Sequence, residues 1–238
     1  MPTHLQPPRH LLILTYGRSG STLLQGLLNR SQTVHVAGEN GDFVYHLFKA
    51  HQVIEATKIQ VGRDPSRTPR HPFFGIDAID QERLRIDLAR AVERQIVASC
   101  PAGKRPHTVG YKEIRYPYKE DLEDYLHFLD ILLSDCAFLF LFRDLERVLQ
   151  SGMFANLSEP QRDNLRGIFL RFENTATTFS IDHPRATVLR YEDFTRNPLK
   201  ILGQLSEVGL SYDLNDLEEV LELPHSYTWS NNNIPSKS

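Results

Sequence analysis

Short apolar runs alternate along this chain with longer segments in which apolar residues recur at helical spacing. Five of the runs are typical of buried strands and cover residues 11–14, 33–37, 108–111, 136–142 and 186–189. The remaining periodic segments predict helices over residues 22–30, 43–57, 80–99, 121–133, 159–181, 199–210 and 213–223. Strands that alternate with helices in this way predict one α/β domain over residues 1–238, with a mainly parallel central sheet flanked by helices.

The loop after the first strand is small, polar and rich in hydrogen-bond donors. It joins the run 11–14 to a helix, and such a corner collects backbone N–H groups at a helix N-terminus, where anions bind. Two glycines allow close backbone approach and four side chains add donors: Gly17, Gly20, Arg18, Ser19, Ser21 and Thr22. The plainer alternative is a corner with a serine N-cap. The P-loop pattern is absent, because no lysine follows Gly20.

Composition and charge narrow the function classes. The 238 residues carry 27 Lys and Arg against 30 Asp and Glu, and the net charge of −3 argues against nucleic-acid binding. Cys100 and Cys136 are far apart, form no zinc pattern and favour a reducing compartment, so we expect a cytoplasmic protein. The polar residues 1–10 predict a flexible N-terminus. The apolar run after them is too short for a signal peptide or a membrane span.

Charged side chains also follow the second and fourth strands. Glu39 lies between glycines after the second strand, and open α/β sheets bind ligands outside the carboxyl ends of their strands. The alternative for Glu39 is a charge that favours the dipole of the next helix. Arg143 ends the fourth strand, and its guanidinium fork matches phosphate geometry. The alternative for Arg143 is a structural ion pair with Asp144.

Three more polar positions stand near strand ends or close after them. Ser151 follows Arg143 by eight residues on the predicted helix and can add a hydroxyl donor. Lys112 leaves the third strand, where the alternative is a surface lysine paired with Glu113. Tyr191 follows the fifth strand, and aromatic residues at strand ends usually belong to the core.

Taken together, these segments resemble the PAPS-dependent sulfotransferases (PAPS is 3′-phosphoadenosine 5′-phosphosulfate). The sequence Arg-Ser-Gly-Ser-Thr-Leu-Leu at 18–24 is similar to their 5′-phosphosulfate loop, in the form of the bacterial and tyrosylprotein branches. Arg143 and Ser151 have the spacing of the family's 3′-phosphate site. Tyr-Glu-Asp at 191–193, followed by Pro198, resembles a recurrent stretch whose tyrosine lies near the adenine. Lys112 resembles a family lysine, although no proline follows it at the family's spacing.

The resemblance implies a P-loop-NTPase-like sulfotransferase fold and transfer of a sulfuryl group from PAPS to an acceptor hydroxyl or amine, leaving 3′-phosphoadenosine 5′-phosphate (PAP). It implies no metal ion. Residues implied in catalysis are Glu39 as general base, Arg18 and Lys112. Residues implied in nucleotide binding are Arg18, Ser19, Gly20, Ser21, Thr22, Arg143, Ser151 and Tyr191. The oligomeric state stays open, as does the acceptor: carbohydrate, lipid, peptide tyrosine or small phenol.

Two alternative functions remain, and two polar segments have expected roles of their own. A P-loop-type kinase or nucleotide hydrolase is disfavoured by the missing lysine and by Arg143, which stands where a metal-binding acid would be expected. A non-catalytic module that binds the 3′,5′-bisphosphorylated nucleotide is the other alternative. Residues 62–75 predict a solvated connector or a mobile acceptor-side loop, and the polar tail 224–238 is a candidate cap over the nucleotide.

Overall fold

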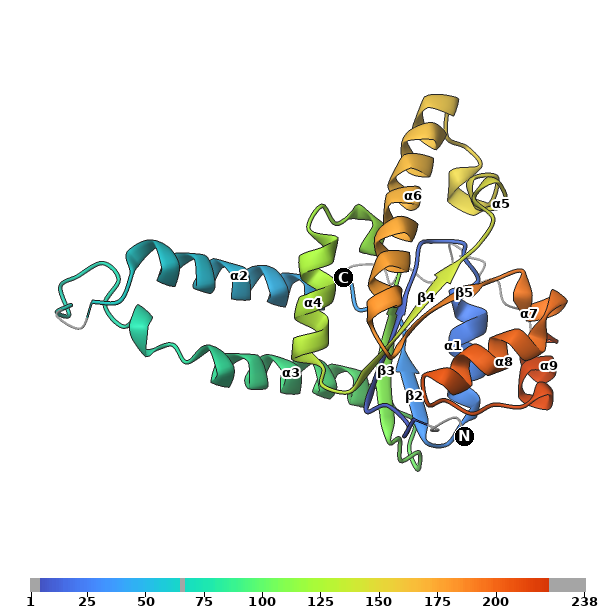
Figure 1. The fold of residues 1–238 in the computed structure, drawn as a ribbon, viewed down its shortest axis with the longest axis horizontal. Coiled ribbons are helices and arrows are strands. Elements are labelled where there is room, and N and C mark those ends of the chain that lie inside the picture. Colours follow the sequence, from blue (N-terminus) through green and yellow to red (C-terminus); the bar gives the residue numbers. More distant parts are fainter. Residues whose placement is uncertain (1–4, 65–66, 223–238) are drawn as a thin grey trace, which may run out of the picture.

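Five parallel strands form one sheet with helices on both faces (Figure 1). The computed structural model describes residues 5–64 and 67–222. The strands are β1 (His10–Leu14), β2 (Val34–Ala37), β3 (Thr108–Glu113), β4 (Cys136–Phe142) and β5 (Ala186–Arg190), and they lie in the order β2-β3-β1-β4-β5. Every strand pair is parallel, so the predicted α/β sheet is confirmed and is fully rather than mainly parallel.

The helices follow the predicted segments, with some ends shorter and others longer than predicted, and the short helix Asp193–Arg196 was not predicted. They are α1 (Ser21–Arg30), α2 (Phe43–Val61), α3 (Gln81–Ala98), α4 (Leu122–Leu132), α5 (Leu145–Leu149), α6 (Glu159–Asp182), α7 (Asp193–Arg196), α8 (Pro198–Glu207) and α9 (Leu214–Leu221). Short 3-10 helices cover Ile76–Ala78, Tyr116–Tyr118 and Gly152–Phe154. None of the helices in the described part of the chain is long and apolar enough to cross a membrane.

The core has two halves, one on each face of the sheet. Side chains alternate along β1, so Leu12 and Leu14 pack with α4 and α6, while Leu11 and Ile13 pack with α1, α8 and α9. All of these β1 side chains are buried. Burial on both faces explains why the central strands appear in the sequence as continuous apolar runs rather than as alternating ones.

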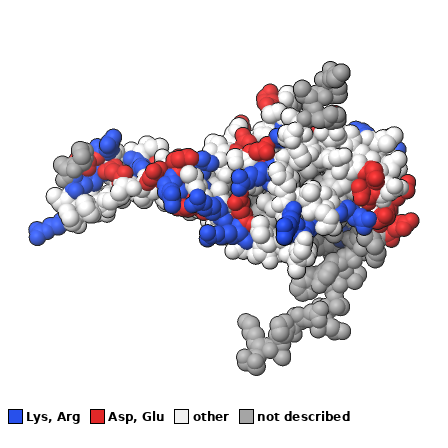
Figure 2. Space-filling view, turned by 90° about the horizontal axis from the view of Figure 1, so that it is seen from below, with Lys and Arg blue, Asp and Glu red and all other residues white. Residues whose placement is uncertain are grey.

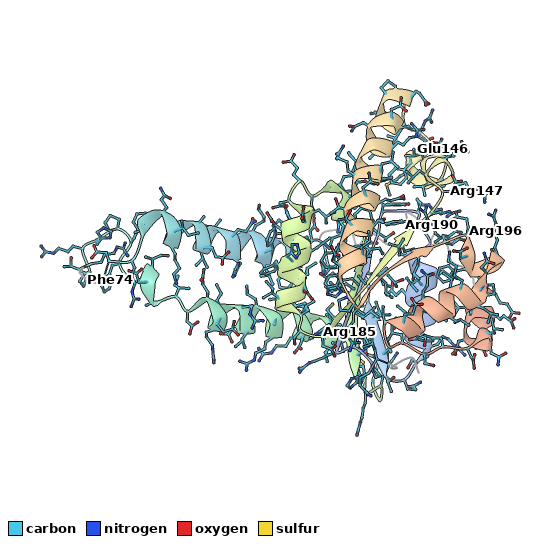
Figure 3. The ribbon with its side chains drawn as sticks, viewed as in Figure 1. Phe74, Glu146, Arg147, Arg185, Arg190 and Arg196 are labelled. Carbon is cyan, nitrogen blue, oxygen red and sulfur yellow. The ribbon has the colours of Figure 1, made fainter. Side chains whose placement is uncertain are left out.

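Helices α2 and α3 form an arm that projects away from the sheet (Figure 1). Its tip carries the exposed side chains of Phe73 and Phe74, the second of which is labelled in Figure 3. Positive and negative side chains are interspersed along the arm (Figure 2). The described residues of the loop 62–75 lie at this tip, and the 19 residues of α2 separate them from Glu39 by about 28 Å. In this structure the loop therefore does not cover Glu39.

The chain is already packed before the first strand begins. Pro8 and His10 are buried, and the backbone N–H groups of Arg9 and His10 donate to the carbonyl of Asp135 at 3.1 and 3.2 Å. We expected residues 1–10 to be flexible, but at least residues 8–10 are packed against the sheet. The tail 224–238, the candidate nucleotide cap, lies outside the described residues.

Candidate functional site

The parallel sheet brings the predicted site residues to one edge, because the carboxyl ends of all five strands meet there. Arg18 follows β1, Glu39 follows β2 and Lys112 lies one residue before the end of β3. Arg143 and Tyr191 come directly after β4 and β5. Residues spread over most of the chain therefore line two hollows along this edge.

The loop between β1 and α1 has the backbone geometry of an anion cradle rather than of a serine-capped corner. Arg18 and Gly20 adopt left-handed conformations, with φ of 68° and 91°. Gly20 is the N-cap of α1, and no side chain caps the helix. The fully buried Ser19 hydroxyl has no hydrogen-bond partner among the described residues. A helix N-terminus with an unpartnered buried hydroxyl beside it suits a phosphate or sulfate group.

Arg143 and Tyr191 close the first hollow. The Arg143 guanidinium lies 4.2 Å from the centre of the Tyr191 ring, and its Nη1 donates to the backbone carbonyl of Arg18 at 2.9 Å. The ion pair with Asp144 is not formed, because Asp144 instead accepts the N–H of Arg147 and caps α5. The hollow has a volume of about 270 Å³, and its lining consists of Arg18, Gly20, Ser21, Thr22, Leu23, Arg143 and Tyr191.

Further arginines lie on this side of the molecule. Figure 3 shows Arg147, Arg190 and Arg196 on α5, at the end of β5 and on α7. The Arg190 guanidinium lies 5.5 Å from the centre of the Phe142 ring. Figure 3 also shows the acidic Glu146 beside Arg147, so the positive charge that faces an anionic ligand comes from Arg18 and Arg143 in the lining of the first hollow.

Gly20 and Tyr191 fit so closely that a larger residue at position 20 is excluded. A Cβ atom on Gly20 would lie 2.1 Å from Cδ2 of Tyr191, and the φ of 91° is itself strained for an alanine. We expect Gly20→Ala to lower the free energy of unfolding by more than about 1–2 kcal/mol, the usual penalty of left-handed backbone alone, and to weaken nucleotide binding.

The control for this prediction is Gly41→Ala. Gly41 also has a positive φ, 67°, but a Cβ atom there meets nothing within 4 Å. Chemical denaturation of both variants separates the clash from the backbone strain. Equal losses in the two variants would show that Tyr191 does not constrain the loop.

Tyr16 holds the backbone of Arg143, a role that sequence reasoning missed. The hydroxyl of this fully buried tyrosine accepts the N–H of Arg143 at 2.9 Å and donates to Glu173 Oε1 at 2.6 Å. Its ring stacks on Phe169 with centroids 4.6 Å apart. Burial raises the pKa of Tyr16 and that of the Glu173 carboxyl. Nothing in the sequence marked Tyr16, because an aromatic residue at a strand end is typical of the core.

Ser151 lies beyond a helix that is shorter than expected. The helix α5 ends at Leu149, so Ser151 is the N-cap of the 3-10 helix Gly152–Phe154 and its hydroxyl donates to the carbonyl of Val148 at 3.0 Å. Ser151 does not line the first hollow. The turn nevertheless packs on the β1–α1 loop, since a Cβ atom on Gly152 would lie 2.9 Å from Nε of Arg18.

Glu39 and Lys112 form an ion pair beside the second hollow. Lys112 Nζ lies 2.7 Å from Glu39 Oε1, and their side chains are 10% and 34% exposed. The alternative for Lys112, a surface pair with Glu113, is not formed, because the Glu113 carboxylate instead accepts from Arg115 and from the N–H of Asp42. The helix α2 begins at Phe43 with Asp42 as N-cap, so Glu39 does not belong to its first turn.

The second hollow lies between the end of β2 and the helix α3. Its volume is about 450 Å³, and its lining consists of Ala37, Gly38, Glu39, Asn40, Phe43, Val44, Val92, Gln95, Ile96, Ser99 and Tyr111. The side-chain Oδ1 of Asn40 is buried there without a partner among the described residues. No group of three or more His, Cys, Asp or Glu in the described parts of the chain could hold a metal ion.

Comparisons with known proteins bear on the family and on the fold. The sequence model of the Sulfotransferase family matches residues 10–213. The sulfotransferase domain of the Synechococcus PCC 7002 olefin synthase has a similar structure, with a TM-score of 0.54, 18% identity and coverage of 94% of this chain and 81% of that chain. A sulfotransferase domain from the curacin biosynthetic pathway is also similar, with a TM-score of 0.51, 14% identity and coverage of 94% of this chain and 80% of that chain. These two likenesses support the fold.

Retinol dehydratase in complex with androsterone and the inactive cofactor PAP was also found, at a TM-score of 0.42 and 15% identity, with coverage of 92% of this chain and 65% of that chain. The search of curated protein sequences found no match. Because the family model spans most of the sequence, from the first residue of β1 to the residue before α9, the chain belongs to the sulfotransferase family.

Proposed function

We propose that this sulfotransferase uses PAPS as donor and an acceptor hydroxyl or amine as nucleophile, and that the first hollow binds the nucleotide. The observation that carries the proposal is the β1–α1 loop: Arg18, Arg143 and the uncapped N-terminus of α1 line one hollow, and the hydroxyl of Ser19 in the same loop is buried without a partner among the described residues. The bound nucleotide would supply the sulfuryl group and a phosphate leaving group.

Each residue of the first hollow suits one part of such a nucleotide. Arg18 and the backbone N–H groups of the loop can stabilise negative charge on the 5′ side. Ser19, Gly20, Ser21 and Thr22 complete this loop. Arg143, with Ser151 in the turn beyond α5, is proposed to bind the 3′-phosphate, because a guanidinium fork matches phosphate. Tyr191 is proposed to support the adenine side, since its ring already lines the hollow.

Glu39 and Lys112 are proposed to act on the acceptor. The ion pair with Lys112 requires Glu39 to be a carboxylate, which is the form that can accept the acceptor's proton. Lys112 uses only Oε1 of this carboxylate, and none of the described residues bonds to Oε2. The free oxygen can therefore take the proton while Lys112 keeps the side chain oriented.

The free thiols of Cys100 and Cys136 support a reducing, cytoplasmic location, which we propose as well.

Transfer of labelled sulfate tests the proposed function directly. The purified chain is incubated with ³⁵S-labelled PAPS and a panel of hydroxyl and amine acceptors, and binding of PAP and of adenosine 5′-monophosphate is measured by calorimetry. We expect labelled product from at least one acceptor and tighter binding of PAP than of the monophosphate. Hydrolysis of ATP with no preference for PAP would favour the kinase or hydrolase alternative. Binding of PAP without transfer to any acceptor would favour the non-catalytic module.

A further inference from the structure

We infer that the acceptor is an uncharged hydroxyl compound with an apolar body, an aryl or alkyl alcohol of small-molecule size, and that it binds in the second hollow. This inference rests on the proposed function and adds the substrate class to it. The second hollow is suited to such a compound by its size, its walls and its charges.

The size of the second hollow fits a small molecule. Its volume of about 450 Å³ falls within the range of roughly 300–1,000 Å³ that is usual for small-ligand sites. The hollow opens beside Glu39, so a bound hydroxyl can reach the free oxygen of the proposed base. A polymer could place only one ring or one side chain inside.

Apolar side chains form one wall of the hollow, opposite polar groups of its lining. Val44, Val92 and Ile96 are almost completely buried, and their side chains form one side together with Phe43 of α2. Apolar walls favour an acceptor that loses apolar surface to them when it binds. They disfavour a polyanionic or highly hydroxylated chain, which would have to give up water without equivalent partners.

The ion pair at the mouth of the hollow disfavours acceptors of either charge. Among the residues that line the hollow, Glu39 carries the one ionised side chain, and Lys112 already balances it at 2.7 Å. A cationic acceptor would compete for Glu39 and leave Lys112, whose side chain is only 10% exposed, without its counter-charge. An anionic acceptor would add a negative charge beside Glu39 with no further cation in the lining.

Neutral polar groups in the lining match a neutral acceptor. Asn40 contributes an amide side chain to the lining, and an amide can donate a hydrogen bond to a hydroxyl or accept one from it. Gln95 of α3 adds an exposed amide, whereas the hydroxyl of Ser99, the C-cap of α3, is already bonded to the carbonyl of Ile96 and to His35. These groups orient an uncharged molecule without requiring a formal charge on it.

Matched acceptors that differ only in charge test the inference. The phenol set is 4-methylphenol, 4-hydroxybenzoate and tyramine, and the alcohol set is 4-methylbenzyl alcohol, 4-(hydroxymethyl)benzoate and 4-(aminomethyl)benzyl alcohol. We expect kcat/KM for the neutral member of at least one set to exceed that of both charged members by about tenfold or more, the effect of roughly one buried hydrogen bond or charge mismatch. Equal or higher values for a charged member would overturn the inference.

Variants of α3 locate the acceptor. Val92→Phe fills the hollow and should lower kcat/KM for the neutral acceptors about tenfold or more while PAP affinity is unchanged. The matched control is Val97→Phe on the same helix, because Val97 is 49% exposed and does not line the hollow. Gln95→Lys places a cation at the exposed side and should shift preference toward 4-hydroxybenzoate or 4-(hydroxymethyl)benzoate. An unchanged preference in Gln95→Lys would overturn the location, even if Val92→Phe fails to fold.

Failure of the inference is distinguishable from failure of the proposed function. Intact PAP binding with transfer only to an acidic peptide or a charged polysaccharide would overturn the acceptor class and leave the proposed function standing. If the unmodified protein binds PAP no more tightly than adenosine 5′-monophosphate, the proposed function itself is overturned.

Discussion

Replacing Glu39 by glutamine is expected to lower turnover by about 10²–10⁴-fold, the usual contribution of positioned proton transfer, while PAP affinity stays unchanged. Glutamine keeps the shape of the side chain and removes the group that accepts the proton. The nucleotide hollow does not include Glu39, so nucleotide binding should survive. Steady-state kinetics with the true acceptor and calorimetry with PAP measure the two effects separately.

The control for Glu39→Gln is Glu218→Gln, an exposed glutamate on α9 that lines neither hollow. A purely structural role for Glu39 would lower the free energy of unfolding through the lost ion pair with Lys112 and leave kcat unchanged. A normal kcat in Glu39→Gln would therefore contradict the proposal. His35 and His46 would then be the next candidates, although burial lowers the pKa of His35, which is hydrogen-bonded to Ser99 at 2.9 Å.

Removing the Arg143 side chain is expected to weaken PAP binding by about tenfold or more, because each hydrogen bond to a charged group contributes roughly 1.5–3 kcal/mol. Affinity for adenosine 5′-monophosphate should change much less, since this ligand lacks the 3′-phosphate. Arg143→Ala therefore loses the selectivity between the two nucleotides. Arg143→Lys keeps the charge and loses the fork of donors, so it should show an intermediate effect.

The matched control for Arg143 is Arg83→Ala, whose side chain is 66% exposed on the arm helix α3. Calorimetry with both nucleotides on all three variants gives the selectivity. If Arg143→Ala keeps the full preference for PAP, the 3′-phosphate lies elsewhere, and Arg147, Arg190 and Arg196 on the same side of the molecule become the groups to test (Figure 3).

The sequence predicted the sheet and the edge where the candidate residues gather. Buried parallel strands must be continuously apolar, so runs such as 136–142 mark strands almost residue for residue. In a parallel sheet the carboxyl ends of all strands lie at one edge. A residue that directly follows a strand can therefore be assigned to that edge from the sequence alone. Arg18, Glu39, Arg143 and Tyr191 were located in this way.

Partners that are distant in sequence could not be predicted. Lys112 pairs with Glu39 rather than with its neighbour Glu113, because the choice depends on how β2 and β3 align. Tyr16 and Arg143 meet across two adjacent strands, and the contact leaves no local pattern.

The direction of the arm was also beyond the sequence. Periodicity reports which face of a helix is apolar and not where the helix points, so α2 and α3 were predicted as helices without their projection from the sheet (Figure 1).

The position of β1 at the centre of the sheet has a consequence for how the chain folds. This strand lies near the N-terminus, yet its neighbours are β3 and β4, and β4 belongs to the second half of the chain. During synthesis β1 has no partner on one side until residue 136 and those after it have emerged. Closing such long loops makes parallel sheets slow to form. The apolar runs of β1 and β4 are thus the segments most prone to aggregation before the chain is complete. Both runs become buried in the same step, when β1 pairs with β4.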